Sequence, residues 1–174
     1  MSFDHIFNNF ERNLIVIDYC RQNRHTSALL ILVYSSIDAM ASLTVELDRE
    51  VQRQDFIDWI NNYFINEIPA HNIDAISLYA ARCSVLHSLG SISRLSKDGR
   101  ALEVGYYWES GDLKELPGTL NRVLEGELIL IEINDLVEAF KKSIENFKSA
   151  ILQNQQLSTT VQNRGLNVFY GHGL

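Results

Sequence analysis

The sequence predicts a mainly α-helical domain, an up-and-down helical bundle with a small β-hairpin inserted before its last helix. Apolar residues recur at helical spacing through the first 90 residues and again over 134–153, whereas alternation at the period of a strand occurs only between about residues 100 and 133. A chain of 174 residues is long enough to bury a core of its own. We therefore predict a single domain over residues 1–174.

The first two helices are predicted from apolar stripes. The stripe of the first helix, which begins near residue 3, consists of Phe3, Ile6, Phe7, Phe10, Leu14 and Ile17. Thr26 or Ser27 can cap the second helix by accepting a hydrogen bond from its first turn. We expect the second helix to run to about Glu50, with a stripe formed by Leu29, Leu30, Val33, Ile37, Met40 and Leu47.

Two more helices complete the predicted block of residues 1–90. Asp55 is the predicted cap of a third helix, whose apolar face consists of Phe56, Trp59, Ile60, Tyr63 and Phe64. Pro69 closes the connection that follows. The fourth helix covers about residues 73–89 and ends near Gly90.

The pattern changes after residue 100. Apolar side chains alternate with others at Leu102, Val104, Tyr106 and Trp108, and the run Leu128–Ile133 is a second strand candidate. A short helix is possible at about 119–125, between turn residues. We predict a β-hairpin insertion over residues 100–133.

The last part of the chain is predicted to contain one helix and a tail. The final helix spans about residues 134–153 and starts at Asn134 or Asp135. Residues 154–174 are polar and tipped with glycine, which predicts a loosely ordered tail.

The charge of the chain restricts its partners. A net charge of −7 and a pI near 5.2 argue against broad affinity for nucleic acid, which depends on lysine and arginine displacing counterions. The balance of charge is positive between residues 82 and 100, a segment with four basic residues and one acidic residue: Arg82, Arg94, Lys97 and Arg100 against Asp98. A polyanion is therefore expected to bind here if it binds anywhere.

Cysteine and histidine usage predicts no metal and no cofactor. Cys20 and Cys83 lie on separate predicted helices without a CxxC pair, and no histidines share the spacing of metal ligands. The N-terminus has no basic region followed by an apolar run, and no stretch approaches the roughly 18 consecutive apolar residues of a membrane span. We expect a cytoplasmic protein without membrane contact.

Arg82 and His87 are the residues best suited to chemistry, and both fall on the fourth predicted helix. Arginine can hold a phosphate with two parallel hydrogen bonds, and histidine can exchange a proton near neutral pH. At about 100° per residue the two are about 140° apart around the helix axis. To act together, Arg82 must reach round the helix, the last turn must distort near Gly90, or a second subunit must complete the site. In the alternative reading, Arg82 pairs with a carboxylate such as Asp38, and His87 is a core or helix-end histidine.

The spacing from Arg82 to His87 resembles the Rx4-6H signature of the HEPN domains, on the helix that carries it in that family. Leu78-Tyr79 before the pair and Ser88 after it also resemble the residues that flank this signature in HEPN domains. The segment Tyr34–Met40 resembles the helix that packs beside the catalytic one. The resemblance covers about residues 5–90 and the final helix.

The resemblance implies a homodimer in which two RxxxxH helices face each other, and metal-independent cleavage of RNA that leaves a 2′,3′-cyclic phosphate. His87 would be the general acid or base, and Arg82 would stabilise charge on the phosphate oxygens. Family members usually have Asn or Asp directly after the arginine, where this chain has Cys83; Ser84 is the expected substitute donor. Asp38, a carboxylate in an apolar helix, is expected to contact Arg82 or another cation of the fourth helix. A strip of small residues, Ser77, Ala81, Ser84 and Ser88, is expected to allow close approach of the second helix.

Three functions stay open at this point. The first is a HEPN ribonuclease of the toxin or phage-defence type, with RNA as its substrate. The second is a HEPN protein that binds RNA or a nucleotide without catalysis. The third is an interaction module that binds an antitoxin such as a nucleotidyltransferase, with Arg82 and His87 serving the interface.

Overall fold

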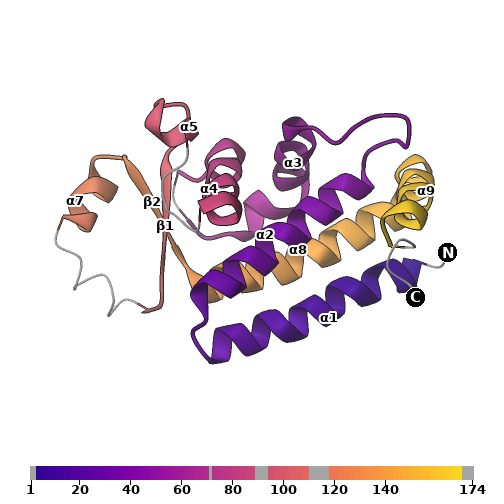
Figure 1. Ribbon diagram of the computed structural model, residues 1–174, viewed down its shortest axis with the longest axis horizontal. Coiled ribbons are helices and arrows are strands. Elements are labelled where there is room, and N and C mark those ends of the chain that lie inside the picture. Colours follow the sequence, from indigo (N-terminus) through magenta and orange to yellow (C-terminus); the bar gives the residue numbers. More distant parts are fainter. Residues whose placement is uncertain (1–2, 71, 89–93, 110–117, 170–174) are drawn as a thin grey trace.

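The protein is a helical bundle with a small two-stranded sheet at one end (Figure 1). The computed structural model describes residues 3–70, 72–88, 94–109 and 118–169. Its elements, in chain order, are α1 (Phe3–Gln22), α2 (Thr26–Leu43), α3 (Arg53–Trp59), a π-helical turn (Ile60–Phe64), a 3-10 turn (Ile65–Glu67), α4 (Ala75–Ser88), α5 (Arg94–Lys97), β1 (Glu103–Tyr107), α7 (Thr119–Leu124), β2 (Leu128–Glu132), α8 (Ile133–Gln153) and α9 (Gln155–Phe169). The prediction of a mainly α fold with a small β insertion is confirmed.

Helix α2 is the centre of the bundle. It packs against α1, α3, α4, α8 and α9, and Figure 1 shows it running between α1 on one side and α3 and α4 on the other. With 18 residues of high hydropathy it is long and apolar enough to cross a membrane, and 50% of that stretch is buried inside the protein. The helices around it account for the apolar composition of α2.

The second helix is shorter than predicted at its C-terminal end. It ends at Leu43 rather than near Glu50, because Thr44 donates its backbone N–H and its hydroxyl to the carbonyl oxygen of Ala41. Such local side-chain bonds compete with continuation of the helix. The cap prediction is also wrong: Thr26 is the first residue of α2, and its Oγ1 accepts a hydrogen bond from Trp108 Nε1 at 2.8 Å.

The third helix forms where predicted, but Asp55 lies inside its first turn. Gln52 is the N-cap, and its backbone N–H donates to Asp55 Oδ2 at 2.6 Å. Arg49 donates two hydrogen bonds to the same carboxylate, which ties the preceding loop to α3. The predicted apolar face continues through the π-helical turn, since Phe56, Trp59, Ile60 and Phe64 are all buried.

The two strands form as predicted, but the β-hairpin is wrong because they run parallel. Glu103 is opposite Leu128 and Tyr107 is opposite Glu132. Side chains alternate between the two faces of the sheet in parallel and in antiparallel strands alike. The connection between the strands therefore decides which of the two orientations forms. A parallel pair needs a crossover of a dozen or more residues, usually with a helix, and α7 lies in that connection.

The predicted loose tail is wrong for residues 155–169, which form α9. Asn154 caps this helix: its Oδ1 accepts hydrogen bonds from the backbone N–H groups of Gln156 and Leu157. Val161 is fully buried, and Gly165 packs directly on Ile6 of α1. Among the described side chains of α9, the apolar ones that pack on the core are Leu157 and Val161, and this pattern is too short to predict a helix. Residues 170–174 lie outside the described part.

Gly165→Ala is expected to destabilise the protein, although alanine normally favours a helix by about 1 kcal/mol over glycine. A Cβ at position 165 would overlap Ile6 Cδ1 and lie 3.1 Å from Ile6 Cγ1, and Ile6 is fully buried. Overpacking costs typically 1–3 kcal/mol. We expect the free energy of unfolding in urea to fall by about 1 kcal/mol, against little change for Gln162→Ala on the exposed face of α9. A rise in stability would show that α9 does not pack this closely on α1.

Candidate functional site

Helix α4 carries the candidate site on its outer face. Asp74 Oδ1 accepts the backbone N–H of Ser77 at 2.6 Å and so caps the first turn. One side of α4 is buried against the bundle: Ala75, Ser77, Leu78, Ala80, Ala81, Ser84 and Val85. The other side, a sector of about 140°, holds the residues that are partly or fully exposed: Ile76, Tyr79, Arg82, Cys83, Leu86 and His87. Arg82 and His87 mark the two edges of this outer face.

The described side chains of the strip of small residues face the bundle. Ser77, Ala81 and Ser84 are all buried within the chain, and Ser77 Oγ accepts a hydrogen bond from the backbone N–H of Leu102 at 3.0 Å, just before β1. The side chain of Ser88 lies outside the described part. Buried side chains cannot meet a second helix, so that expectation for the strip is wrong, and Ser84 faces the bundle rather than the outer face that carries Arg82.

Asp38 holds Arg82, as expected from the sequence. Arg82 Nε donates to Asp38 Oδ2 at 2.8 Å and to Oδ1 at 3.1 Å, and Arg82 Nη2 donates to Oδ2 at 2.6 Å. The pair joins α4 to α2 and is partly open to solvent, with side chains 22% and 29% exposed. Burial lowers the pKa of Arg82, but the hydrogen bonds and charge of Asp38 outweigh it, so the pKa lies above its usual value.

This geometry leaves part of the guanidinium available. Asp38 uses the edge formed by Nε and Nη2, whereas Nη1 lies 3.9 Å from Cys83 Sγ. The end of the guanidinium, formed by Nη1 and the second hydrogen of Nη2, can still donate hydrogen bonds to two oxygens of a phosphate. Asp38 thus orients Arg82 without using all its donors.

Tyr79 lies beside Arg82 and between two cations. The Cζ of Arg53 is 5.0 Å and the Cζ of Arg82 is 5.9 Å from the centroid of its ring. Burial raises the pKa of Tyr79, and the contact with Cys83 raises it further against the opposing effect of the two arginines. Cys83 therefore meets Tyr79 and Arg82 on the outer face.

His87 is exposed in the last turn of α4. The helix is regular through Ser88, so its side chain keeps the expected separation of about 140° from Arg82. Within the described ranges, His87 has no hydrogen bond or ion pair. The structure therefore places both predicted residues on one face of one helix but does not bring their side chains together. Gly90, where a distortion was considered, lies outside the described residues.

Arg53 is the site residue that sequence analysis missed. It lines a pocket of about 160 Å³ between α2, α3 and α4, whose wall consists of Asp38, Ala41, Val51, Gln52, Arg53, Phe56, Tyr79 and Arg82. Arg53 and Arg82 are far apart in the sequence and share no motif. The only signal that connects them is the packing of α3 beside α4.

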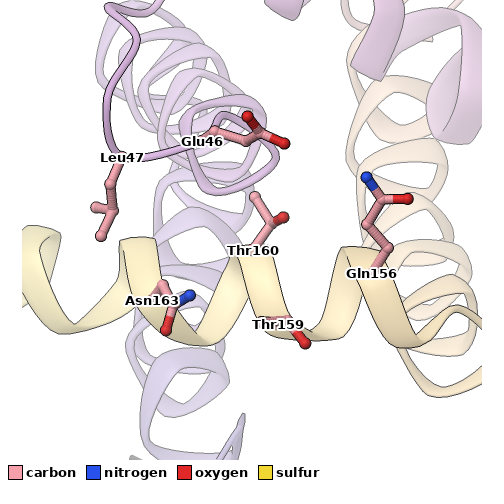
Figure 2. A pocket seen from close by; sticks show the side chains of 6 residues that line it. All are labelled: Glu46, Leu47, Gln156, Thr159, Thr160 and Asn163. Atoms are coloured by element: carbon pink, nitrogen blue, oxygen red, sulfur yellow. The ribbon is translucent and has the colours of Figure 1, made fainter.

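A larger pocket lies between the α2–α3 loop and α9 (Figure 2). It has a volume of about 290 Å³ and is lined by Glu46, Leu47, Gln156, Thr159, Thr160 and Asn163. Glu46 is the one ionisable residue in this lining, and the nearby guanidinium of Arg164 is already bonded to the backbone carbonyl oxygens of Glu46 and Leu47. It therefore offers hydrogen bonds but no reactive group.

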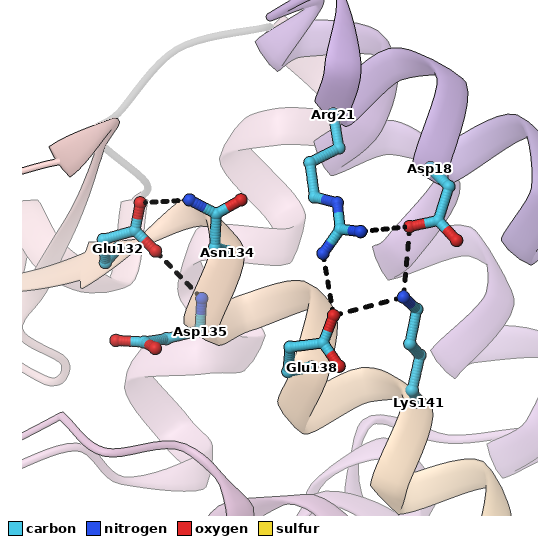
Figure 3. A network of polar contacts seen from close by, with 7 residues as sticks. All are labelled: Asp18, Arg21, Glu132, Asn134, Asp135, Glu138 and Lys141. Carbon is cyan, nitrogen blue, oxygen red and sulfur yellow. Dashed lines mark hydrogen bonds and ion pairs between the residues drawn. The ribbon is translucent and has the colours of Figure 1, made fainter.

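The charged cluster between α1 and α8 is balanced (Figure 3). Arg21 and Lys141 each bridge Asp18 and Glu138, at distances from 2.7 to 3.1 Å. Burial raises the pKa of Glu138, but the hydrogen bonds from Lys141 and Arg21 outweigh it and the pKa lies below its usual value. With every charge paired, this cluster holds two helices together and offers no free group for chemistry.

The described residues contain no group of three histidine, cysteine, aspartate or glutamate side chains placed to hold a metal ion. The α4 face presents guanidinium, imidazole, thiol and phenol groups, those of Arg82, His87, Cys83 and Tyr79. Comparison of the chain with known protein families, with curated proteins and with solved structures found no match.

Proposed function

We propose that this protein is a metal-independent endoribonuclease of the HEPN type that acts as a homodimer. The observation that carries the proposal is the arrangement on α4: Asp38 orients Arg82 and leaves Nη1 with only the long contact to Cys83 Sγ, and His87 is exposed on the same outer face. An anion-stabilising group and a proton-transfer group are the two parts that RNA cleavage by internal transfer needs.

The reaction follows from these groups. The 2′-oxygen of a ribose attacks the neighbouring phosphorus and loses its proton to a base, while the 5′-oxygen of the next nucleotide leaves and takes up a proton from an acid. His87 supplies proton transfer, and Arg82 stabilises the negative charge that develops on the phosphate oxygens. The products carry a 2′,3′-cyclic phosphate and a free 5′-hydroxyl.

A second copy of the chain is the partner proposed for the outer face of α4. Its centre is apolar for an exposed helix surface: Ile76 is 40% exposed, and Tyr79 and Leu86 are partly so. Arg82 and His87, about 140° apart, flank this apolar centre. Two such faces packed about a two-fold axis would place Arg82 of one protomer near His87 of the other.

The surroundings of α4 suit RNA better than the net charge of the chain suggests. Helices α3, α4 and α5 are neighbours along one side of the molecule (Figure 1). Arg53 on α3 and Lys97 and Arg100 at the end of α5 add positive charge to this side. We propose a cytoplasmic toxin or phage-defence role, in which an antitoxin would cover the same side.

A non-catalytic HEPN protein that binds RNA, a nucleotide or an antitoxin is the second candidate. Two observations favour it: Asp38 already neutralises the charge of Arg82, and Cys83 stands where the family usually has a polar residue. In this alternative, Arg82 and His87 serve recognition only.

Incubation of the purified protein with total RNA separates these candidates. We expect cleavage that persists in excess EDTA and products that end in 2′,3′-cyclic phosphate, detected by their resistance to a phosphatase that removes only open monophosphates. Heat-denatured protein is the control for contaminating nuclease. Intact RNA under all conditions would favour the binding alternative.

The dimer is expected to depend on the apolar centre of the outer face. We expect light scattering at micromolar concentration to give the mass of two chains for the wild type. Ile76→Glu should give the mass of one chain, because a dimer of this variant would bury two carboxylates close to each other across the two-fold axis. Leu124→Glu, at an apolar residue of α7 that is 77% exposed, is the matched control and should stay dimeric. A wild-type monomer would contradict the composite site.

A further inference from the structure

We propose that Arg53 and Arg82 together form a binding site for a phosphate group, in the pocket between α2, α3 and α4. Both guanidinium groups line this pocket of about 160 Å³. Both also lie within 6 Å of the ring centroid of Tyr79, at 5.0 and 5.9 Å. The pocket thus brings a second cation to Arg82 from a different helix.

Arg53 differs from the other half-buried arginines of the chain. Arg21, Arg82 and Arg122 each hold a carboxylate at 2.6 or 2.7 Å. Arg164 donates hydrogen bonds to backbone carbonyl oxygens instead. Arg53 has no carboxylate or carbonyl partner in the part of the chain that the structure describes, where its guanidinium lies near the ring of Tyr79. Its donors are therefore available to an anion from outside.

The charge of the pocket wall favours an anion. Arg53 and Arg82 contribute two positive charges, and Asp38 is the one acidic residue in the wall. Because Asp38 accepts its hydrogen bonds from Arg82, the remaining charge belongs to Arg53. A local positive charge in a chain of net charge −7 is a specific feature rather than part of a general basic surface.

Phosphate is the anion that fits these donors. The free end of the Arg82 fork and the unpaired fork of Arg53 can each bind phosphate oxygens in pairs. Val51, Phe56 and Ala41 form an apolar wall beside them, and Val51 is 45% exposed. This combination suits the phosphate of a nucleotide, either free or within a strand. If a strand is the ligand, Arg53 would hold the phosphate next to the scissile one that Arg82 stabilises; that placement rests on the proposed function, whereas phosphate binding by the pocket does not.

Titration of the full-length protein with phosphate ligands tests the site. The probes are inorganic phosphate, adenosine 5′-monophosphate and an all-2′-deoxy oligonucleotide, which cannot be cleaved by attack of a 2′-hydroxyl. We expect Arg53→Gln to weaken binding of each probe that binds the wild type by about tenfold or more, since a charge-assisted hydrogen bond is lost. Arg12→Gln, at an exposed arginine of α1 on another side of the bundle, should bind as the wild type does.

The measurements also separate this site from the proposed nuclease. Tighter binding of the oligonucleotide than of the monophosphate identifies a strand as the ligand, and equal binding identifies a free phosphate. In RNA cleavage, Arg53→Gln should raise KM and leave kcat nearly unchanged. Phosphate binding lost in Arg53→Gln, in a protein that cuts no RNA, would support the site and refute the nuclease. If Arg53→Gln cuts RNA with an unchanged KM and binds phosphate as the wild type does, the phosphate site is refuted and the nuclease is not. A correctly folded wild type that binds none of the probes would refute the phosphate site as well.

Discussion

His87→Ala is expected to abolish RNA cleavage and to leave the fold intact. If His87 moves the proton in the reaction, its loss should lower the rate by about 10²–10⁴-fold, the usual contribution of a positioned acid or base. The fold should not change, because His87 is exposed and makes no hydrogen bond or ion pair within the described part of the chain. Substitutions at such positions usually alter the free energy of unfolding by no more than about 0.5 kcal/mol.

The measurement compares initial rates on one RNA substrate with thermal unfolding of the same preparations. His25→Ala is the matched control, because His25 is also exposed but lies before α2, and it should cut as the wild type does. A His87→Ala variant that retains full activity would refute the nuclease mechanism. A variant that loses both activity and its melting transition would show instead that His87 supports the fold.

The helices were largely predictable because their apolar stripes are dense. Phe56, Ile60 and Phe64 follow one another at helical spacing, and the hydrophobic effect buries that face whatever it packs against. Helix α9 was not predictable from the sequence. Its burial depends on Val161 and on the close fit of Gly165 to Ile6, and that fit is visible only once α1 is in place. The parallel strands were missed for a similar reason: alternation gives the face of each side chain but not the direction of the strand.

The candidate site was predictable to the extent that single charges stand out in apolar helices. Asp38 and Arg82 are charged residues in otherwise apolar segments, and burial of either one alone is costly, so their pairing could be expected. Arg53 was not predictable, because a loop and a second helix bring it to the pocket. The sequence also gave no indication that Ser84 faces inward, which depends on how α4 is rotated against the bundle.

Arg82→Lys is expected to lower cleavage at least about 100-fold although it keeps the positive charge. The guanidinium uses one edge for Asp38, and in the proposed mechanism its other edge binds the substrate. An ammonium group is a point charge and cannot present two fixed edges at once. It will either pair with Asp38 or reach the phosphate, and in both cases one of the two tasks of Arg82 is lost. Cleavage by Arg82→Lys at the wild-type rate would show that only the charge matters.

Asp38→Asn tests the same arrangement from the other side, and it should lower both the melting temperature and the cleavage rate. The variant leaves Arg82 charged without its counter-charge, but the pair is 22% and 29% exposed, so solvent screening limits the expected loss of stability to about 1 kcal/mol, or roughly 2–4 °C. Glu103→Gln is the matched control, since it breaks the 2.7 Å pair between Glu103 and Arg122, which includes no residue of α4. That control should cost similar stability and leave cleavage unchanged. If Asp38→Asn behaves like the control, Asp38 stabilises the bundle and does not position Arg82; if it changes neither property, the pair contributes nothing.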